Sequence, residues 1–126
     1  MSLPEDALHK VLMELQTRLL ENNRQLNIVK TQIQTKEREK RFAELTKHEL
    51  SSLNENIRTY KSVGKAFIKT DINILKSDLE TTITKTVSDL TALGKSKKYI
   101  ERNISDSEAG LREIIGRPLS NIDNKP

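Results

Sequence analysis

The side chains that most often carry catalysis are few in this sequence and stand far apart. It contains two histidines, His9 and His48, and no cysteine, which excludes a disulfide, a thiolate nucleophile and a zinc–cysteine site. Serines and threonines are common, but none is expected to have a histidine base beside it. We therefore expect His9 to be a solvated helix residue and predict no metal site.

Motifs that bind phosphate or nucleotides are also missing from the sequence. It has no GxxxxGK[ST] loop and no dinucleotide-binding glycine triplet. The many carboxylates alternate with Lys and Arg, as in solvated i,i+4 pairs on helix surfaces, and form no acid/base dyad. The sequence predicts a protein that is not an enzyme and uses no cofactor.

Two short clusters of basic residues raise the question of nucleic acid. They read KEREKR from Lys36 to Arg41 and KSKK from Lys95 to Lys98. Nucleic-acid binding favours a continuous basic stripe, whereas Glu37 and Glu39 interrupt the first cluster and no aromatic residue accompanies it. We expect solvated helix surface and no nucleic-acid partner. The net charge of +4 permits acidic partners without demonstrating one.

The composition favours long exposed helices over a compact globule. Apolar residues make up 34%, aromatic residues 3% and charged residues 32% of the 126 residues, so a large core is hard to build. The regular spacing of Leu and Ile argues against full disorder. No apolar run approaches the ~20 residues that cross a bilayer. The first residues, MSLPEDALHK, lack an apolar signal core. We expect a cytoplasmic protein without membrane contact.

A heptad pattern predicts the first helix, from about residue 3 to residue 45. Apolar residues recur every three or four positions, and Gly or Pro is absent after Pro4. The pattern fails at Lys36 and Lys40, where the partner surface must tolerate lysine side chains. The a positions are Leu12, Leu19, Leu26, Ile33 and Lys40, and the d positions are Leu8, Leu15, Asn22, Val29, Lys36 and Ala43.

A second heptad pattern predicts another helix of similar length, from about residue 71 to residue 116. Asp71 or Thr70 is the expected N-cap, and Pro118 is expected to end the pattern, leaving residues 117–126 as a disordered tail. The a positions are Ile83, Leu90, Lys97, Ile104 and Leu111, and the d positions are Ile72, Leu79, Thr86, Leu93, Ile100, Ser107 and Ile114.

The pattern changes between the two helices. Thr46 and Glu49 have the spacing of a capping box and predict a short separate helical turn through about Leu53. The hairpin region is expected over about residues 54–70: residues 54–56 form a turn, and the residues from Ile57 then alternate, with Gly64-Lys65 as a tight turn between two strands. A structureless loop is the alternative interpretation of this segment.

These elements predict a mainly α fold in which two long helices form an antiparallel coiled-coil hairpin. The connection lets the second helix fold back on the first and places a short β-hairpin between them. A lone two-stranded hairpin is marginally stable in water, and its edges are open to pairing with other chains. We therefore expect the strands to join those of other subunits.

At the hairpin the sequence resembles a known family. The run from Tyr60 to Ile68 is similar to the Y-x-x-V-G-x-x-F-I stretch of β-type prefoldin subunits. Upstream, Leu45-Thr46-x-x-Glu49-Leu50 resembles the segment that leaves the first helix in that family. Downstream, residues 97–102 resemble its K-x-Y-L-E-R stretch. The resemblance extends over about residues 5–116, so residues 1–116 are interpreted as a single prefoldin-like domain.

The resemblance implies a place in a hetero-hexamer. Two α-type and four β-type subunits join their hairpins into paired β-barrels, so five other prefoldin subunits are the expected partners. The coiled coils would hold unfolded proteins, actin and tubulin among them, without ATP and deliver them to the cytosolic group II chaperonin. The basic net charge of this chain departs from the family, whose members are often neutral or acidic.

Two sets of residues are the candidate functional surfaces. The expected assembly surface consists of Ile57, Tyr60, Val63, Gly64, Phe67 and Ile68. The expected client-binding tip consists of Leu3, Leu8, Val11, Leu12, Leu111, Ile114 and Ile115. We call the stripe formed by the a and d positions the heptad seam. Val11 and Ile115 fall outside it, which makes them candidates for exposed apolar contact. The alternative is that all the tip residues simply close the end of the coiled coil.

Two other function classes share part of this pattern. A structural coiled-coil adaptor or tethering subunit would have the heptads but would not need the hairpin between Tyr60 and Ile68. A nucleic-acid-binding coiled coil would bind DNA or RNA with a steep salt dependence.

Overall fold

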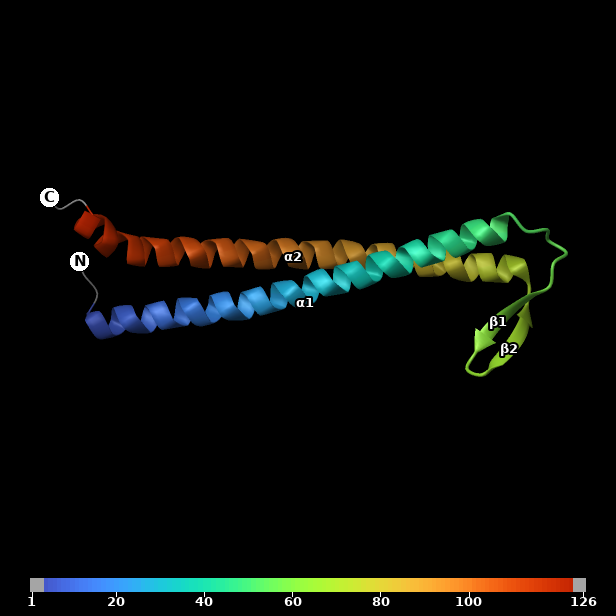
Figure 1. Ribbon diagram of the computed structural model, residues 1–126, viewed down its shortest axis with the longest axis horizontal. Helices are drawn as coiled ribbons and strands as arrows, with labels where there is room; N and C mark the ends of the chain where they lie inside the picture. Colours follow the sequence, from blue (N-terminus) through green and yellow to red (C-terminus); the bar gives the residue numbers. More distant parts are fainter. Residues whose placement is uncertain (1–3, 124–126) are drawn as a thin grey trace. The chain divides into compact units, whose positions relative to one another are not determined.

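Two long helices joined by a two-stranded antiparallel hairpin make up the computed structural model, which describes residues 4–123 (Figure 1). Helix α1 spans Glu5–Ser51 and helix α2 spans Ile72–Asp123. Strands β1, Thr59–Val63, and β2, Ala66–Thr70, lie between them in the sequence. The predicted mainly α fold with a central β-hairpin is confirmed.

The chain divides into two units, each containing a stretch of both helices. The first unit comprises Met1–Thr31 and Gly94–Pro126, and the second comprises Gln32–Leu93 with the hairpin. In the first unit, a Cβ atom built on Gly110 would lie 3.7 Å from Leu15 Cδ1, an ordinary van der Waals distance. Asn22 and Asn103 line one hollow between the same helices. Residue numbers therefore rise along one helix as they fall along the other, and the helices are antiparallel.

In the second unit, ion pairs link the two helices. Lys36 Nζ lies 3.4 Å from Asp89 Oδ2, and Lys47 pairs with Glu80. From the first pair to the second, the residue number rises on α1 and falls on α2, so the helices are antiparallel here too. Lys36 sits at a predicted seam position and is partly buried, and its pairing with Asp89 shows how a lysine is accommodated there.

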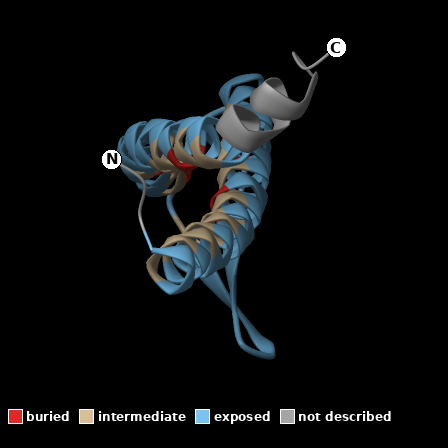
Figure 2. Ribbon diagram, turned by 90° about the vertical axis from the view of Figure 1, so that its left-hand side faces the viewer, coloured by how far each residue is buried: buried red, intermediate tan, exposed pale blue. Residues whose placement is uncertain are grey.

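The predicted heptad seam is the interior of each unit. Every predicted a and d position on both helices is at least partly buried. Figure 2 colours the buried residues red and those of intermediate burial tan. Among the described residues, the apolar ones classed as fully buried are Val29, Ala43, Ile72 and Ile104. Two buried seam residues are polar, namely Thr86 and Ser107. The Thr86 hydroxyl donates a hydrogen bond to the Thr82 carbonyl at 2.7 Å, which satisfies it without a partner across the seam.

The first helix differs from its predicted bounds at its C-terminal end. Helix α1 continues to Ser51, so the expected break near residue 45 and the separate turn at Thr46 are wrong. The Thr46 hydroxyl donates to the Phe42 carbonyl at 2.8 Å, a bond within a continuous helix that leaves no cap at this position. At the other end, residue 3, where the first helix was expected to begin, lies outside the described residues.

The second helix begins as predicted but ends later. Asp71 is its N-cap, because its Oδ1 atom accepts a hydrogen bond from the Asn73 N–H at 2.8 Å. The helix continues to Asp123, past Gly116 and Pro118, where the sequence predicted its end. A proline removes one backbone hydrogen bond and can kink a helix without terminating it.

The hairpin forms around the predicted Gly64-Lys65 turn. Val63 pairs with Ala66, so the loop has two residues. Gly64 has a φ of 61°, and no other residue in the described part of the chain has a positive φ. A glycine with positive φ at the first loop position is the arrangement of a type II′ turn, which matches the twist of the strands. The β-hairpin is therefore confirmed over the loop alternative.

Candidate functional site

The hairpin presents two chemically different faces. Cross-strand partners lie on the same face of an antiparallel pair, so the register sorts the side chains. We call one face the aromatic face; it carries Tyr60, Ser62, Phe67 and Lys69. We call the other the aliphatic face; it carries Thr59, Lys61, Val63, Ala66, Ile68 and Thr70.

Large apolar side chains are exposed on both faces of the hairpin. Phe67 is 73% exposed and Tyr60 54% on the aromatic face, and Val63 and Ile68 are also exposed on the aliphatic face. The sheet has only two strands, so each strand has an outer edge that pairs with no other strand of the described chain. Exposed apolar residues beside unpaired strand edges are the features of a surface that another chain covers.

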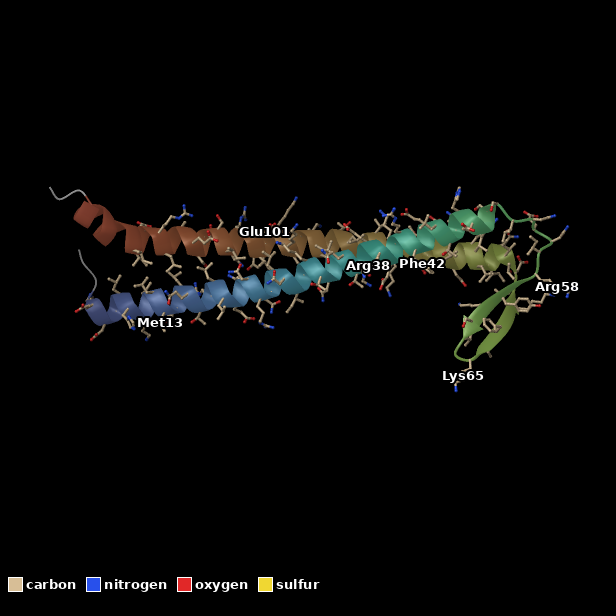
Figure 3. The ribbon with its side chains drawn as sticks, viewed as in Figure 1. Met13, Arg38, Phe42, Arg58, Lys65 and Glu101 are labelled. Atoms are coloured by element: carbon tan, nitrogen blue, oxygen red, sulfur yellow. The ribbon has the colours of Figure 1, made fainter. Side chains whose placement is uncertain are left out.

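The base of the hairpin is held to the start of α2. Lys61 Nζ, on the aliphatic face, lies 3.7 Å from Asp78 Oδ2. The Thr59 hydroxyl donates a hydrogen bond to the Thr70 carbonyl, which ties the two strands at their open end. Figure 3 labels Lys65 at the opposite end, in the turn. The ion pair at Lys61 and the hydrogen bond at Thr59 thus lie away from the turn, where Lys65 is exposed.

Ile57 is the one predicted assembly residue that lies outside the strands. Its N–H donates to the Asn54 carbonyl at 3.0 Å in the turn that precedes β1. Its side chain is exposed and lines a hollow at the base of the hairpin with Thr59 and Thr70. The structure therefore gathers the six predicted assembly residues on or beside one hairpin.

The described residues of the predicted tip lie in the first unit. The pairing of Leu15 with Gly110 brings the start of α1 and the segment Leu111–Ile115 to the same end of that unit. Leu8, Leu12, Leu111 and Ile114 are partly buried in the seam. Leu3 lies outside the described residues.

The two tip residues outside the seam behave differently from each other. Ile115 is 41% exposed, as expected for an apolar residue available to a partner. Val11 is partly buried, so less of its side chain is exposed than that of Ile115. It precedes the a position Leu12, and residues that flank the a and d positions share the edge of the buried stripe.

The perturbed ionisable groups belong to helix surfaces. Hydrogen bonds from Arg24, and secondarily from Gln25, lower the pKa of the Glu21 carboxyl. The charge of Glu39 is the main cause that raises the pKa of Lys36, with Asp89 adding to it. These partners are about one helix turn apart or, for Lys36 and Asp89, lie on the two different helices, and they provide local pairing.

Exposed apolar residues on the helices are a feature that the sequence reasoning missed. Phe42 is 72% exposed and Leu45 is also exposed on α1, and Ile74 is exposed near the start of α2. In the predicted register, Phe42 and Leu45 fall between the a and d positions, on the side of α1 away from the seam. Large apolar residues at such heptad positions were the available signal.

The comparisons with known proteins agree with this geometry. The model of the family described as "Prefoldin subunit" matches residues 13–117. The chain belongs to the prefoldin subunit family. The prefoldin match therefore includes the hairpin and most of both helices.

Among sequence relatives, a probable prefoldin subunit 1 from Dictyostelium discoideum is 34% identical, covering 84% of this chain and 92% of the relative. Prefoldin subunit 1 from Arabidopsis thaliana is 31% identical, covering 88% of this chain and 87% of the relative. The resemblance to prefoldin subunits is confirmed, and both of these relatives are named as subunit 1.

A solved prefoldin structure has the same fold. The crystal structure of the prefoldin beta subunit from Thermococcus strain KS-1 superposes with a TM-score of 0.76 at 22% identity, covering 89% of this chain and 94% of that chain. None of the helices, over the residues that the structure describes, has an apolar stretch able to cross a membrane. In that same part of the chain, no group of three or more His, Cys, Asp or Glu could hold a metal ion.

Proposed function

We propose that this prefoldin-family chain is one β-type subunit of a hetero-hexamer with two α-type and four β-type subunits. The observation that carries the assembly is the exposed two-faced hairpin with unpaired edges. Pairing with strands of neighbouring subunits would satisfy the edge N–H and C=O groups and cover Tyr60, Val63, Phe67 and Ile68.

The complex would act as an ATP-independent co-chaperone in the cytoplasm. It holds unfolded proteins, including actin and tubulin, and delivers them to the cytosolic group II chaperonin. Non-native chains expose apolar side chains, which bind to apolar surface through the hydrophobic effect. The exposed Ile115 supports a contact surface at the predicted tip, together with its neighbours Ile114 and Leu111. No step in this function requires a catalytic residue.

Native mass spectrometry of the complex purified through a C-terminal tag tests the assembly. Six different chains of about this one's size give an expected mass of roughly 90–100 kDa, one small domain per chain. A monomer, a homodimer or a complex with large scaffold proteins would instead favour the coiled-coil adaptor.

A second measurement tests the chaperone activity on its own. The purified complex is mixed with denatured actin that is diluted from denaturant, and aggregation is followed by light scattering without ATP. The proposed activity predicts that the complex suppresses the scattering when it is present at a concentration close to that of the actin. A hexamer that leaves the scattering unchanged would retain the assembly proposal and reject the holding function.

A further inference from the structure

Four exposed residues of α2 form a continuous stripe outside the seam. Lys95, Lys98, Tyr99 and Arg102 have the spacing i, i+3, i+4 and i+7, which places them on one face of a helix. All four are exposed, and the last three line one shallow hollow. We call these four residues the basic stripe.

The stripe belongs to a strongly basic segment of α2. Residues 95–102 contain four basic side chains and one acidic one, a net charge of +3. Glu101 is the single acid of the segment and lies about 100° around the helix from Arg102. Figure 3 labels Glu101 on α2, with nitrogen-tipped side chains on either side of it.

The cations of the stripe have no acidic partner in the described part of the chain. Lys95, Lys98 and Arg102 make no ion pair there, whereas Arg24, Lys36, Lys40, Lys47 and Lys61 do. The stripe itself contains three cations and no acid, and cations without an ion pair leave a local positive potential at the surface. That potential fits a negatively charged partner.

Tyr99 adds an apolar contact to the charge. It is the only aromatic residue of its unit and is 66% exposed, so its ring is not packed in the heptad seam. Tyrosine and arginine are enriched at protein interfaces, where the ring contributes contact area and the guanidinium binds carboxylates in a bidentate manner. An exposed tyrosine between unpaired cations therefore points to a peptide partner.

We propose that the basic stripe is a docking surface for a short acidic segment of another protein. The stripe is about 10 Å long at 1.5 Å per residue, which matches three to four residues of an extended peptide. Carboxylates of the segment pair with the two lysines and Arg102, and an apolar side chain covers the Tyr99 ring. The proposal does not depend on the chaperone function, because the stripe lies in the unit without the hairpin and outside the predicted tip.

A protein partner is favoured over single-stranded nucleic acid. Sequence-tolerant binding of single strands uses several aromatic side chains on which successive bases stack. The stripe offers one aromatic ring, and its unit has no other. The test must therefore distinguish binding of an acidic peptide from binding of nucleic acid.

Fluorescence anisotropy with a labelled peptide tests the proposal. The probe is a ten-residue peptide of Glu and Asp with one central Phe, titrated with the full chain at low and physiological salt. The triple variant Lys95→Glu, Lys98→Glu, Arg102→Glu should bind at least about tenfold more weakly, since each exposed pair adds a modest amount. Added salt should weaken the wild-type binding.

A matched variant controls for net charge. Arg38→Glu, Arg41→Glu and Lys85→Glu change the charge equally at exposed positions that also lack an ion pair in the described chain. If the stripe is the binding site, the peptide affinity of this control variant should differ from wild type by less than about twofold at physiological salt, where long-range effects of net charge are screened. Circular dichroism of both triple variants verifies that the helices remain folded. An equal loss in the control would overturn the proposal.

Tyr99 is tested separately from the charges. Tyr99→Ala should weaken peptide binding several-fold, and Tyr99→Phe should retain it, because the ring provides the apolar contact. Absence of peptide binding up to millimolar chain would refute the docking surface. Tighter binding of an oligonucleotide of equal charge, lost in the same stripe variants, would reject the peptide in favour of nucleic acid.

Discussion

At the scale of single residues, Gly64 has the most restrictive backbone in the described chain. Its φ of 61° is strained for any side chain, yet a Cβ atom built on it would meet nothing within 4 Å. The constraint at Gly64 is therefore one of backbone conformation and not of space. Gly94 differs, because it lies inside α2 with ordinary helical backbone and also has open space around a Cβ.

Replacing these two glycines should have opposite effects. Gly64→Val should destabilise the hairpin by about 1–2 kcal/mol through left-handed backbone strain. Gly94→Ala should stabilise α2 by about 1 kcal/mol through helix propensity. Hydrogen exchange of the strand amides measures the first effect and a thermal melt of helical ellipticity the second. Unchanged strand protection in Gly64→Val would contradict the role assigned to Gly64.

The Glu21–Arg24 pair predicts a pH-dependent contribution to α1. The pKa of Glu21 is lowered in the folded chain, so the pair stabilises the helix above the unfolded pKa. That contribution is lost as the pH falls through the folded pKa. Glu21→Gln should therefore melt below wild type at about pH 7 and coincide with it at about pH 2. Glu14→Gln is the control, and an equal pH-dependent difference there would rule out a specific pair.

At the scale of elements, the helix ends and the seam obey different physics. The seam follows from a repeat of apolar residues along each helix, and even its polar members, Thr86 and Ser107, are buried. The start of α2 instead depends on one side chain. Asp71 accepts the Asn73 N–H, one of the four donors that a helix start leaves without an intrahelical partner.

Removing the Asp71 cap should therefore weaken α2 at its start. Asp71→Ala should cost about 1 kcal/mol, whereas Asp71→Asn should retain most of the stability because asparagine also caps well. Chemical denaturation followed by circular dichroism measures both variants. Equal midpoints for the alanine and asparagine variants would exclude the capping role.

At the scale of the whole molecule, assembly should depend on the hairpin and not on exposed aromatic surface in general. Phe67 is 73% exposed and Phe42 is 72% exposed, so the two positions are matched in residue type and exposure. They differ in place, since Phe67 lies on the aromatic face of the hairpin and Phe42 on α1.

Phe67→Asp should abolish the hexamer while helical content is retained, because it buries a charge in the proposed interface between subunits. Phe42→Asp should leave the hexamer intact. Native mass spectrometry after co-expression with the other subunits separates the two. A Phe67→Asp hexamer of unchanged stability, or loss of assembly in both variants, would refute the hairpin as the assembly surface.

Truncation tests the proposed tip separately from assembly. Removal of residues 1–8 and 112–126 deletes Ile114, Ile115 and the first turn of α1 but leaves the hairpin. The shortened chain should enter the hexamer and suppress client aggregation more weakly, as light scattering would show. Full suppression by the truncated complex would place client binding elsewhere.

The sequence by itself determined the elements whose cause is local. The heptad positions, the Asp71 cap and the Gly64-Lys65 turn were all predicted, because periodicity, capping and positive φ depend on neighbouring residues. The same local rules misplaced both C-terminal helix ends. A capping-box spacing at Thr46 or a proline at position 118 does not by itself terminate a helix.

Only the tertiary structure decided how residues distant in the sequence meet. It paired Lys61 with Asp78, left Val11 partly buried and Ile115 exposed, and left the cations of the basic stripe without ion pairs in the described chain. The physical reason is that solvent exposure and ion pairing depend on which surface lies opposite. A periodic pattern determines the face of a helix but not the neighbour that covers it.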